Sequence, residues 1–289
     1  MELSKTILGL PYREDDRVLN ITNFVAEYLH NPNVEIEAKL GYFKSHENGF
    51  NVLHIQEFDP QKAGAKFESS LQPLMFFSLL DSLKLACKEV TYTETEDHLY
   101  TCTGRDSKIR QTINCNSEII AIIKKTKIAD KNFLLNCSGT GIRISANYEE
   151  VLSEIPENSK FSIMRKKKRH AFRYQYLEVD LTEVSMNNKL TYEVEIEIVD
   201  FEFVKKHVEN FVIGREKGVL VGICRKIWQN ALSLSFHKPK ASVVRVEENR
   251  QILEERELAY QMHYGDNRPV IGDYLYCCAL EKNNAEMVV

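Results

Sequence analysis

The chain has 289 residues, of which 43% are hydrophobic and 28% are charged, and its formal net charge at pH 7 is −4. These values are typical of a soluble globular protein. Because the net charge is negative, a global positive field that binds nucleic acid is excluded, and an anionic substrate must meet cations that cluster locally. No apolar run reaches the length of a membrane-spanning helix, and the first residues lack the basic-then-apolar order of a signal peptide. We therefore expect an intracellular protein that does not span a membrane.

The cysteines indicate a reducing compartment. They are odd in number and scattered, with no C-x-x-C pair and no spacing typical of zinc ligands. The seven are Cys87, Cys102, Cys115, Cys137, Cys224, Cys277 and Cys278. The Cys-x5-Arg spacing occurs at residues 137–143, but we interpret this segment as a turn that leads into a strand and not as a phosphatase loop, so a cysteine nucleophile is not expected. The histidines form no metal pair at i, i+2 or i, i+4, and we expect structural or surface roles for them.

The N-terminal part predicts a helix, a strand and a second helix. Apolar residues recur at helical spacing over residues 21–29 and stop before Pro32. Over residues 34–43, apolar and charged residues alternate, as in a strand with two different faces. Residues 71–90 are apolar at i, i+3 and i+4, which predicts a helix that packs outside a sheet.

Seven strands are predicted next, and the turn residues between them indicate an antiparallel meander. These strands cover residues 91–103, 108–114, 118–128, 141–151, 161–174, 177–184 and 191–199.

Helical apolar spacing returns after the strands, over residues 201–236, with a break near Gly214. Beyond Pro239 the sequence predicts another helix-like run and a strand near residues 273–279. We expect one domain over residues 1–289, with a core at about 34–200 and flanks at 1–33 and 201–289.

The charged faces of these strands indicate a closed barrel. One strand with alternating glutamates is explained by a sheet face in water. Several consecutive strands repeat the design, however, and their opposite faces are too apolar to meet solvent. If helices cover the apolar faces, the charged faces line an interior, and a sheet of about eight strands that closes on itself leaves room for a ligand. The predicted fold is therefore α+β, a closed eight-stranded antiparallel β-barrel with helices packed on the outside.

A charged interior needs compensation, because alternate glutamates on one strand repel one another and their pKa values rise. The densest acidic strand carries Glu193, Glu195 and Glu197. Carboxylates from two strands suit Mg²⁺ or Mn²⁺, which keep waters and share substrate phosphates. Strand-borne cations that can grip an oligophosphate are Arg110, Lys124, Arg143, Lys167 and Arg169. Phosphoryl transfer needs little beyond a metal, cations and an oriented water.

Two motifs carry a resemblance to a known family. Residues 35–39 read E-I-E-A-K, which is similar to the E-x-E-x-K signature of triphosphate tunnel metalloenzymes. Residues 192–197 read Y-E-V-E-I-E and resemble the second glutamate strand of the fungal mRNA-capping RNA 5′-triphosphatases. Each motif alone is weakly specific, but both occur in this order with R-I-S-A-N-Y-E at 143–149 and V-D-L-T-E-V at 179–184 between them. The resemblance covers about residues 34–199.

The resemblance implies a homodimer of eight-stranded tunnels that removes the γ-phosphate from 5′-triphosphate RNA with Mg²⁺, or hydrolyses nucleoside triphosphates with Mn²⁺. Carried over by motif, the metal ligands are Glu35, Glu37 and Glu197, and the residues that position the attacking water are Glu195 and Glu149. Arg110, Lys124, Lys167 and Arg169 hold phosphate oxygens, and Asp180 and Thr182 support those cations. Glu193 and Arg143 complete the set of candidate residues.

Two points stay open at this stage. The choice between Lys124 and Lys125 is unsettled because the strand parity there is ambiguous, and Lys125 and Lys127 are otherwise expected in solvent. Relatives have a basic residue where this chain has Glu178, so that contact must come from elsewhere, and Arg173 is the candidate.

The basic run at residues 165–169 has two interpretations, a nuclear-localisation or nucleic-acid patch and a strand whose odd positions face the interior. The second is favoured because the run continues directly into a strand pattern.

The predicted function is removal of the γ-phosphate from nascent mRNA in cap formation. One alternative is a tunnel enzyme for inorganic triphosphate or another small oligophosphate. The other is a non-catalytic, transcription-associated scaffold. The resemblance also implies action in the nucleus, a capping guanylyltransferase as partner, and contact with phosphorylated repeats of RNA polymerase II or an elongation factor.

Overall fold

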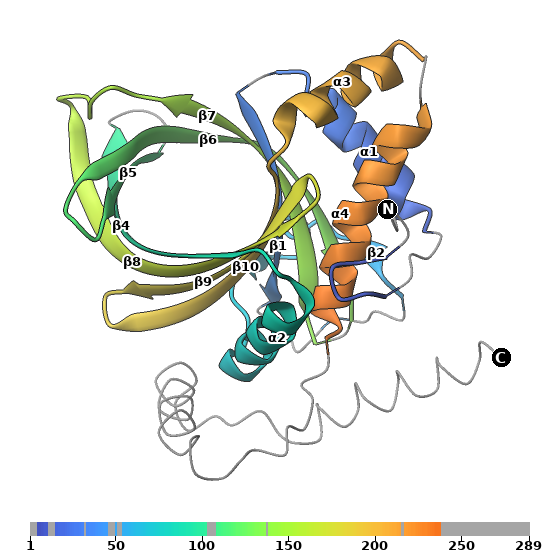
Figure 1. Cartoon of the computed structure of the whole chain (residues 1–289), viewed down its shortest axis with the longest axis horizontal. Coiled ribbons are helices and arrows are strands. Elements are labelled where there is room, and N and C mark those ends of the chain that lie inside the picture. The colour runs from blue at the N-terminus through green and yellow to red at the C-terminus, as the bar shows by residue number, and fades with distance from the viewer. Residues whose placement is uncertain are drawn as a thin grey trace, which may run out of the picture. The chain divides into compact units, whose positions relative to one another are not determined.

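The strands of this chain close into an antiparallel barrel, which confirms the predicted fold class (Figure 1). The computed structural model describes residues 5–10, 15–31, 33–45, 50, 54–102, 108–136, 138–214 and 217–237. The barrel strands are β1 (Val34–Ser45), β4 (Val90–Cys102), β5 (Lys108–Asn114), β6 (Ile119–Leu134), β7 (Thr140–Val151), β8 (Ser159–Tyr174), β9 (Leu177–Met186) and β10 (Lys189–Ile198). They pair in the order β10-β9-β8-β4-β5-β6-β7-β1, and β1 pairs with β10 to close the ring.

The apolar faces of the strands point outward, where helices cover part of the barrel. On β1 these outward residues include Ile36 and Leu40, and both are buried. The helices are α1 (Arg17–Tyr28), α2 (Pro73–Ala86), α3 (Phe201–Val212) and α4 (Lys217–Ser235). α4 packs on β1 and β7, α1 packs on α4, and α2 packs on β10 (Figure 1). Trp228 of α4 lies against Phe133 with ring centroids 4.7 Å apart, so this layer is a true apolar core.

Two short strands that the sequence pattern does not predict lie at one end of the barrel. They are β2 (Gln56–Glu57), which pairs with β6, and β3 (Ala65–Glu68), which pairs with β1. Phe43, on the same face of β1 as the glutamates, packs there with Phe67 and Leu134. Gly41 is required at this crossing, because a Cβ built on it would lie 2.1 Å from the Glu68 carbonyl oxygen.

The remaining differences from prediction are in element limits. β6 continues six residues beyond residue 128, through a register shift between Lys127 and Ala129. The predicted break near Gly214 is confirmed as the gap between α3 and α4. The predicted elements beyond Pro239 lie outside the described residues. None of the described helices combines the length and apolar character needed to span a bilayer.

Candidate active site in the tunnel

Three glutamates cluster where β1 meets β10. Antiparallel pairing places Glu37 opposite Glu197, and Glu35 lies two residues before Glu37 on the same strand face. One carboxylate oxygen from each of the three lies within 4.8 Å of the other two. Several carboxylate oxygens converging at one point are the ligand set that a hard divalent cation prefers.

The protonation behaviour of this cluster fits a metal. Burial, together with repulsion from Glu195 and Glu35, raises the pKa of Glu197 to about 8. Burial also raises the pKa of Glu37, although Lys39 lies beside it. Carboxylates so placed are costly to ionise without a neighbouring cation, and a divalent ion among them supplies the missing positive charge. The three residues therefore fit Mg²⁺ or a similar ion.

Lys39 links the cluster to a second acidic group. Its ammonium lies 3.1 Å from Glu37 and also pairs with Glu195. Burial opposes the charge on Lys39, but these carboxylates outweigh burial and raise its pKa. Burial opposes ionisation of Glu195 too, and Lys39 outweighs it, lowering the pKa of Glu195 to about 2. The ion pair with Lys39 therefore favours the ionised form of Glu195.

Lys125, and not Lys124, faces the interior, so the placement of Lys124 in the tunnel is corrected. Lys125 pairs with Glu35 and lies 3.2 Å from Glu149. Lys124 lies on the opposite face of β6, where its amine is 2.9 Å from Glu150. The expectation that Lys125 is solvated is therefore wrong. The strand is apolar on both faces just before these lysines, so alternation gave no parity signal there.

The basic run of β8 forms the cationic wall of the tunnel, which confirms the strand interpretation of residues 165–169. Arg165 and Lys167 lie 3.0 and 3.2 Å from Asp97 of β4, which is 0% exposed. Burial opposes ionisation of Asp97, but Lys167 and Arg110 outweigh it and lower its pKa. Burial and the neighbouring Arg169 lower the pKa of Lys167. This wall carries more cations than acids, so it suits an anion.

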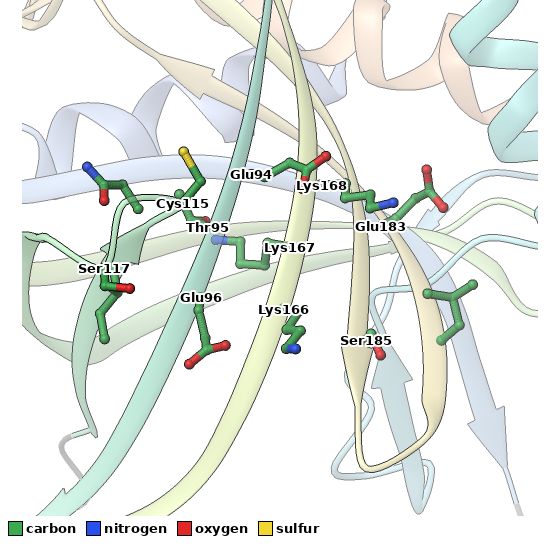
Figure 2. Close-up of a pocket in the computed structure, with 13 residues that line it drawn as sticks. Glu94, Thr95, Glu96, Cys115, Ser117, Lys166, Lys167, Lys168, Glu183 and Ser185 are labelled. Carbon is green, nitrogen blue, oxygen red and sulfur yellow. The ribbon is translucent and has the colours of Figure 1, made fainter.

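Figure 2 shows Lys167 and Lys168 leaving β8 on opposite sides. The amine of Lys168 lies between Glu94 and Glu183, its register partners on β4 and β9. A cavity of about 550 Å³ borders these strands and the β5–β6 turn, and Lys167 is among its lining residues.

Asp180 and Thr182 lie on β9 beside the cations of β8, and Asp180 contacts Arg169. Arg169 is 2.7 Å from Asp180, which is 0% exposed. Burial nevertheless raises the pKa of Asp180 to about 7. Thr182 lies opposite both Arg169 and Glu193 in the sheet, and its hydroxyl is buried without a hydrogen bond to any described residue.

Arg110 and Glu149 leave polar atoms open to a ligand. The Arg110 guanidinium lies 3.9 Å from Glu149, which is close enough for attraction but not for a hydrogen bond. Arg110 Nε and Glu149 Oε1 are both buried without a hydrogen bond to any described residue. Buried polar atoms of this kind are suited to bind a substrate or a water.

Asn147 is a site residue that the sequence did not reveal. Its amide donates a 2.8 Å hydrogen bond to Glu37 Oε1, and both residues are buried. Because that oxygen is occupied, Glu37 is held in one orientation. Lys39, Asp97 and Arg165 were also not among the predicted site residues. Arg165 has a signal in hindsight, since it has the same odd parity as Lys167 and Arg169.

Three predicted positions lie away from this centre or at its edge. Arg143 shares the tunnel face of β7 but pairs with Asp130 and Asn132 near β3, apart from the glutamate cluster. Burial and repulsion from Glu195 raise the pKa of Glu193, which lies on the same strand face as Glu195. Arg173 faces Glu178 in register and donates to the Gln175 carbonyl oxygen at its own turn.

Comparison with known proteins supplies a family. Residues 13–220 match the family described as "mRNA capping enzyme, beta chain". The mRNA-capping enzyme subunit beta of Schizosaccharomyces pombe is 28% identical over 203 residues, which cover 63% of this chain and 67% of that protein. The solved structure of S. pombe Pct1 RNA triphosphatase in complex with the Spt5 CTD aligns with a TM-score of 0.70 at 25% identity, covering 80% of this chain and 97% of that one. Pct1 RNA triphosphatase alone aligns with a TM-score of 0.68 at 24% identity, covering 77% and 93%.

Proposed function

We propose a site mechanism for this chain from the premise that it belongs to the family of mRNA capping enzyme beta chains. The family and the tunnel fold make it an RNA 5′-triphosphatase, a hydrolase that acts in mRNA capping. One observation carries the mechanism: the tunnel has an acidic wall and a cationic wall. The acidic wall consists of Glu35, Glu37 and Glu197, and the cationic wall consists of the basic residues of β8.

The acidic wall holds the metal. Glu35, Glu37 and Glu197 are the ligands, and the ion is Mg²⁺, with Mn²⁺ serving for free nucleoside triphosphates. Such an ion supplies Lewis-acid stabilisation of charge on the phosphate oxygens. Asn147 and Lys39 keep Glu37 in its ligating orientation through the hydrogen bond and the ion pair described above.

The cationic wall holds the triphosphate. Arg169, Lys167 and Arg165 present donors to the phosphate oxygens, and the buried acids behind them, Asp97 and Asp180, fix their positions. The charge that develops on the transferring phosphoryl group is stabilised by these preorganised cations. Arg110 adds a further donor through its open Nε.

Glu149 orients the attacking water. Its Oε1 lies 3.2 Å from the Lys125 amine but makes no hydrogen bond to any described residue, so it can accept one from a water. The water adds to the γ-phosphorus and the bond to the bridging oxygen of the β-phosphate breaks, which yields orthophosphate and diphosphate-ended RNA. The carboxylate of Glu195 is paired with Lys39, so Glu195 influences this water indirectly, by positioning Lys39.

Assembly and cellular context are further parts of this proposal. We infer a homodimer, action in the nucleus and a single folded domain for residues 1–289. S. pombe Pct1 RNA triphosphatase has been solved in complex with the Spt5 CTD, which supports phosphorylated repeats of the transcription machinery as a partner of this chain. A capping guanylyltransferase is the expected partner in the pathway.

The test is release of phosphate from RNA labelled at the γ-phosphate, with Mg²⁺, with Mn²⁺ and with chelator. We expect metal-dependent release that stops in a Glu35→Ala/Glu37→Ala protein whose circular dichroism is unchanged. Release by the chelated enzyme at the full rate would contradict the metal assignment. Inorganic triphosphate run in parallel identifies a small-substrate enzyme if it is hydrolysed faster than RNA.

A further inference from the structure

A second cavity lies beside the end of the tunnel that β3 covers. Its volume is about 770 Å³, and it lies between β6, β7 and the segment that connects β2 to β3. None of the metal-cluster residues lines it. Its lining residues include Phe58, Lys66, Phe67, Lys127, Asn132 and Arg143.

Arg143 is held in this cavity through only part of its guanidinium. Its Nε donates a 2.8 Å hydrogen bond to Asn132 and lies 3.4 Å from Asp130. The flat face of the guanidinium stacks on Phe67, 4.5 Å from the ring centroid. Within the described residues, its two terminal nitrogens make no hydrogen bond. A guanidinium that is fixed through its Nε and its flat face, with both terminal nitrogens unbonded, can bind an oxyanion through two parallel hydrogen bonds.

The charges around the cavity are unbalanced. Five lining residues are basic and three are acidic, in a chain whose net charge is negative. Each acid already has a basic partner, since Asp130 pairs with Lys127, Glu57 with Lys131 and Asp59 with Lys62. Lys66 and the fork of Arg143 therefore supply the excess positive charge, and an anion is the complementary ligand.

The cavity is next to the place where the reaction makes an anion. Arg143 is the direct register partner of Lys39, so their Cα atoms are about 5 Å apart. Lys39 contacts Glu37 at 3.1 Å, so the cavity begins one residue pair from the metal cluster. The γ-phosphate is the terminal group of the RNA 5′ end, so orthophosphate released at the metal cluster forms close to this cavity.

We propose that the Arg143 cavity is an oxyanion site that takes the orthophosphate released by the reaction. This inference rests on the proposed function for the source of the anion, but the binding site itself is built only from Arg143, Lys66 and their neighbours. The terminal nitrogens of Arg143 donate to two oxygens of orthophosphate, and Lys66 adds charge at the rim.

The test is equilibrium dialysis of the full chain against radiolabelled orthophosphate, without metal or RNA. We expect Arg143→Gln to bind one orthophosphate fewer per chain than the wild type, or to bind it at least about tenfold more weakly, as loss of a charge-assisted pair implies. Lys44→Gln is the matched control, because it removes one exposed cation from β1 outside this cavity. In assays with RNA, the same Arg143→Gln change should weaken product inhibition by orthophosphate.

Lys66→Gln guards against a folding defect in the Arg143 variant. Lys66 is exposed at the rim of the cavity, so replacing it leaves the core intact. The substitution should weaken orthophosphate binding about threefold. Equal binding by the wild type, Arg143→Gln and Lys66→Gln overturns the proposal, as does an equal loss in Lys44→Gln. Failure of the wild type to release phosphate from RNA would instead overturn the proposed function, and the dialysis result separates the two.

Discussion

The two faces of β8 differ although they come from one uninterrupted basic run. Lys167 and Arg169 face the tunnel and lie within 3.2 and 2.7 Å of buried acids. Lys168, between them in sequence, points outward to Glu94 and Glu183 at the barrel surface. Similar basic side chains therefore have different consequences on the two faces, because water screens the outer charges and the buried acids fix the inner cations. The role of a charged residue in this barrel therefore depends on which face of its strand it occupies.

The largest difference between the faces is expected at the acidic wall. Glu37→Gln keeps the shape of the side chain but removes a metal ligand and the partner of Lys39, so kcat should fall about 10³-fold. The measurement is phosphate release from triphosphate-ended RNA at saturating Mg²⁺. Glu150→Gln on the outer face of β7 is the control and should stay within about twofold. Equal losses in both proteins would mean that parity does not decide function.

The cationic wall gives the sharpest comparison between neighbours. Arg169→Ala removes a guanidinium that Asp180 positions, and kcat/KM for RNA should fall about 10²-fold or more. Lys168→Ala removes the same charge from the outer face and should change it less than about twofold. Steady-state kinetics at two salt concentrations check this, since a loss through general electrostatics shrinks as salt rises.

Lys124 and Lys125 repeat the comparison on the opposite side of the barrel. Lys125→Ala leaves Glu35 and Glu149 without their cation, and we expect about a 10²-fold lower kcat. Lys124→Ala removes only a pair that is partly exposed to solvent, with Glu150, and should be nearly neutral. Loss of activity in Lys124→Ala alone would contradict the structure, because it would mean that Lys124 and not Lys125 faces the tunnel.

Asn147 should give the smallest effect, because it acts through Glu37. Asn147→Ala removes one hydrogen bond to a ligand carboxylate, and the Mg²⁺ concentration for half-maximal activity should rise about tenfold. At saturating Mg²⁺ kcat should recover most of its wild-type value. A loss that no Mg²⁺ concentration restores would assign Asn147 a role on the substrate instead.

Sequence patterns were sufficient where each strand has one apolar and one charged face. That condition holds in β1, β9 and β10, and alternation alone places Asp180 of β9 and the glutamates of β1 and β10 on the inner face. It fails in β6, where isoleucines occupy both faces before Lys124, and a register shift follows Lys127. In such a stretch, the alternation of apolar and polar residues cannot show which side chains face the tunnel.

Long-range contacts were the other part that the sequence could not give. Asp97 becomes a site residue only because β4 pairs with β8, and three strands separate these two in the sequence. Residues 56–68 form β2 and β3, whose two- and four-residue lengths are too short for a period to show. Arg143 was predicted with the phosphate-holding cations because nothing in its own strand reveals that Asn132 and Phe67 hold it elsewhere.

The seam between β1 and β10 has a consequence for how this protein matures. Glu37 comes from the first strand of the barrel and Glu197 from the last, so neither half of the chain contains the whole of the proposed metal site. A growing or truncated chain that lacks β10 carries an inactive, unpaired β1 edge, and hydrolysis begins only once the ring has closed. A bound ion that joins both strands also favours the closed ring over any opened form. Catalytic activity therefore reports that the barrel has closed, and a bound metal stabilises the pairing between β1 and β10.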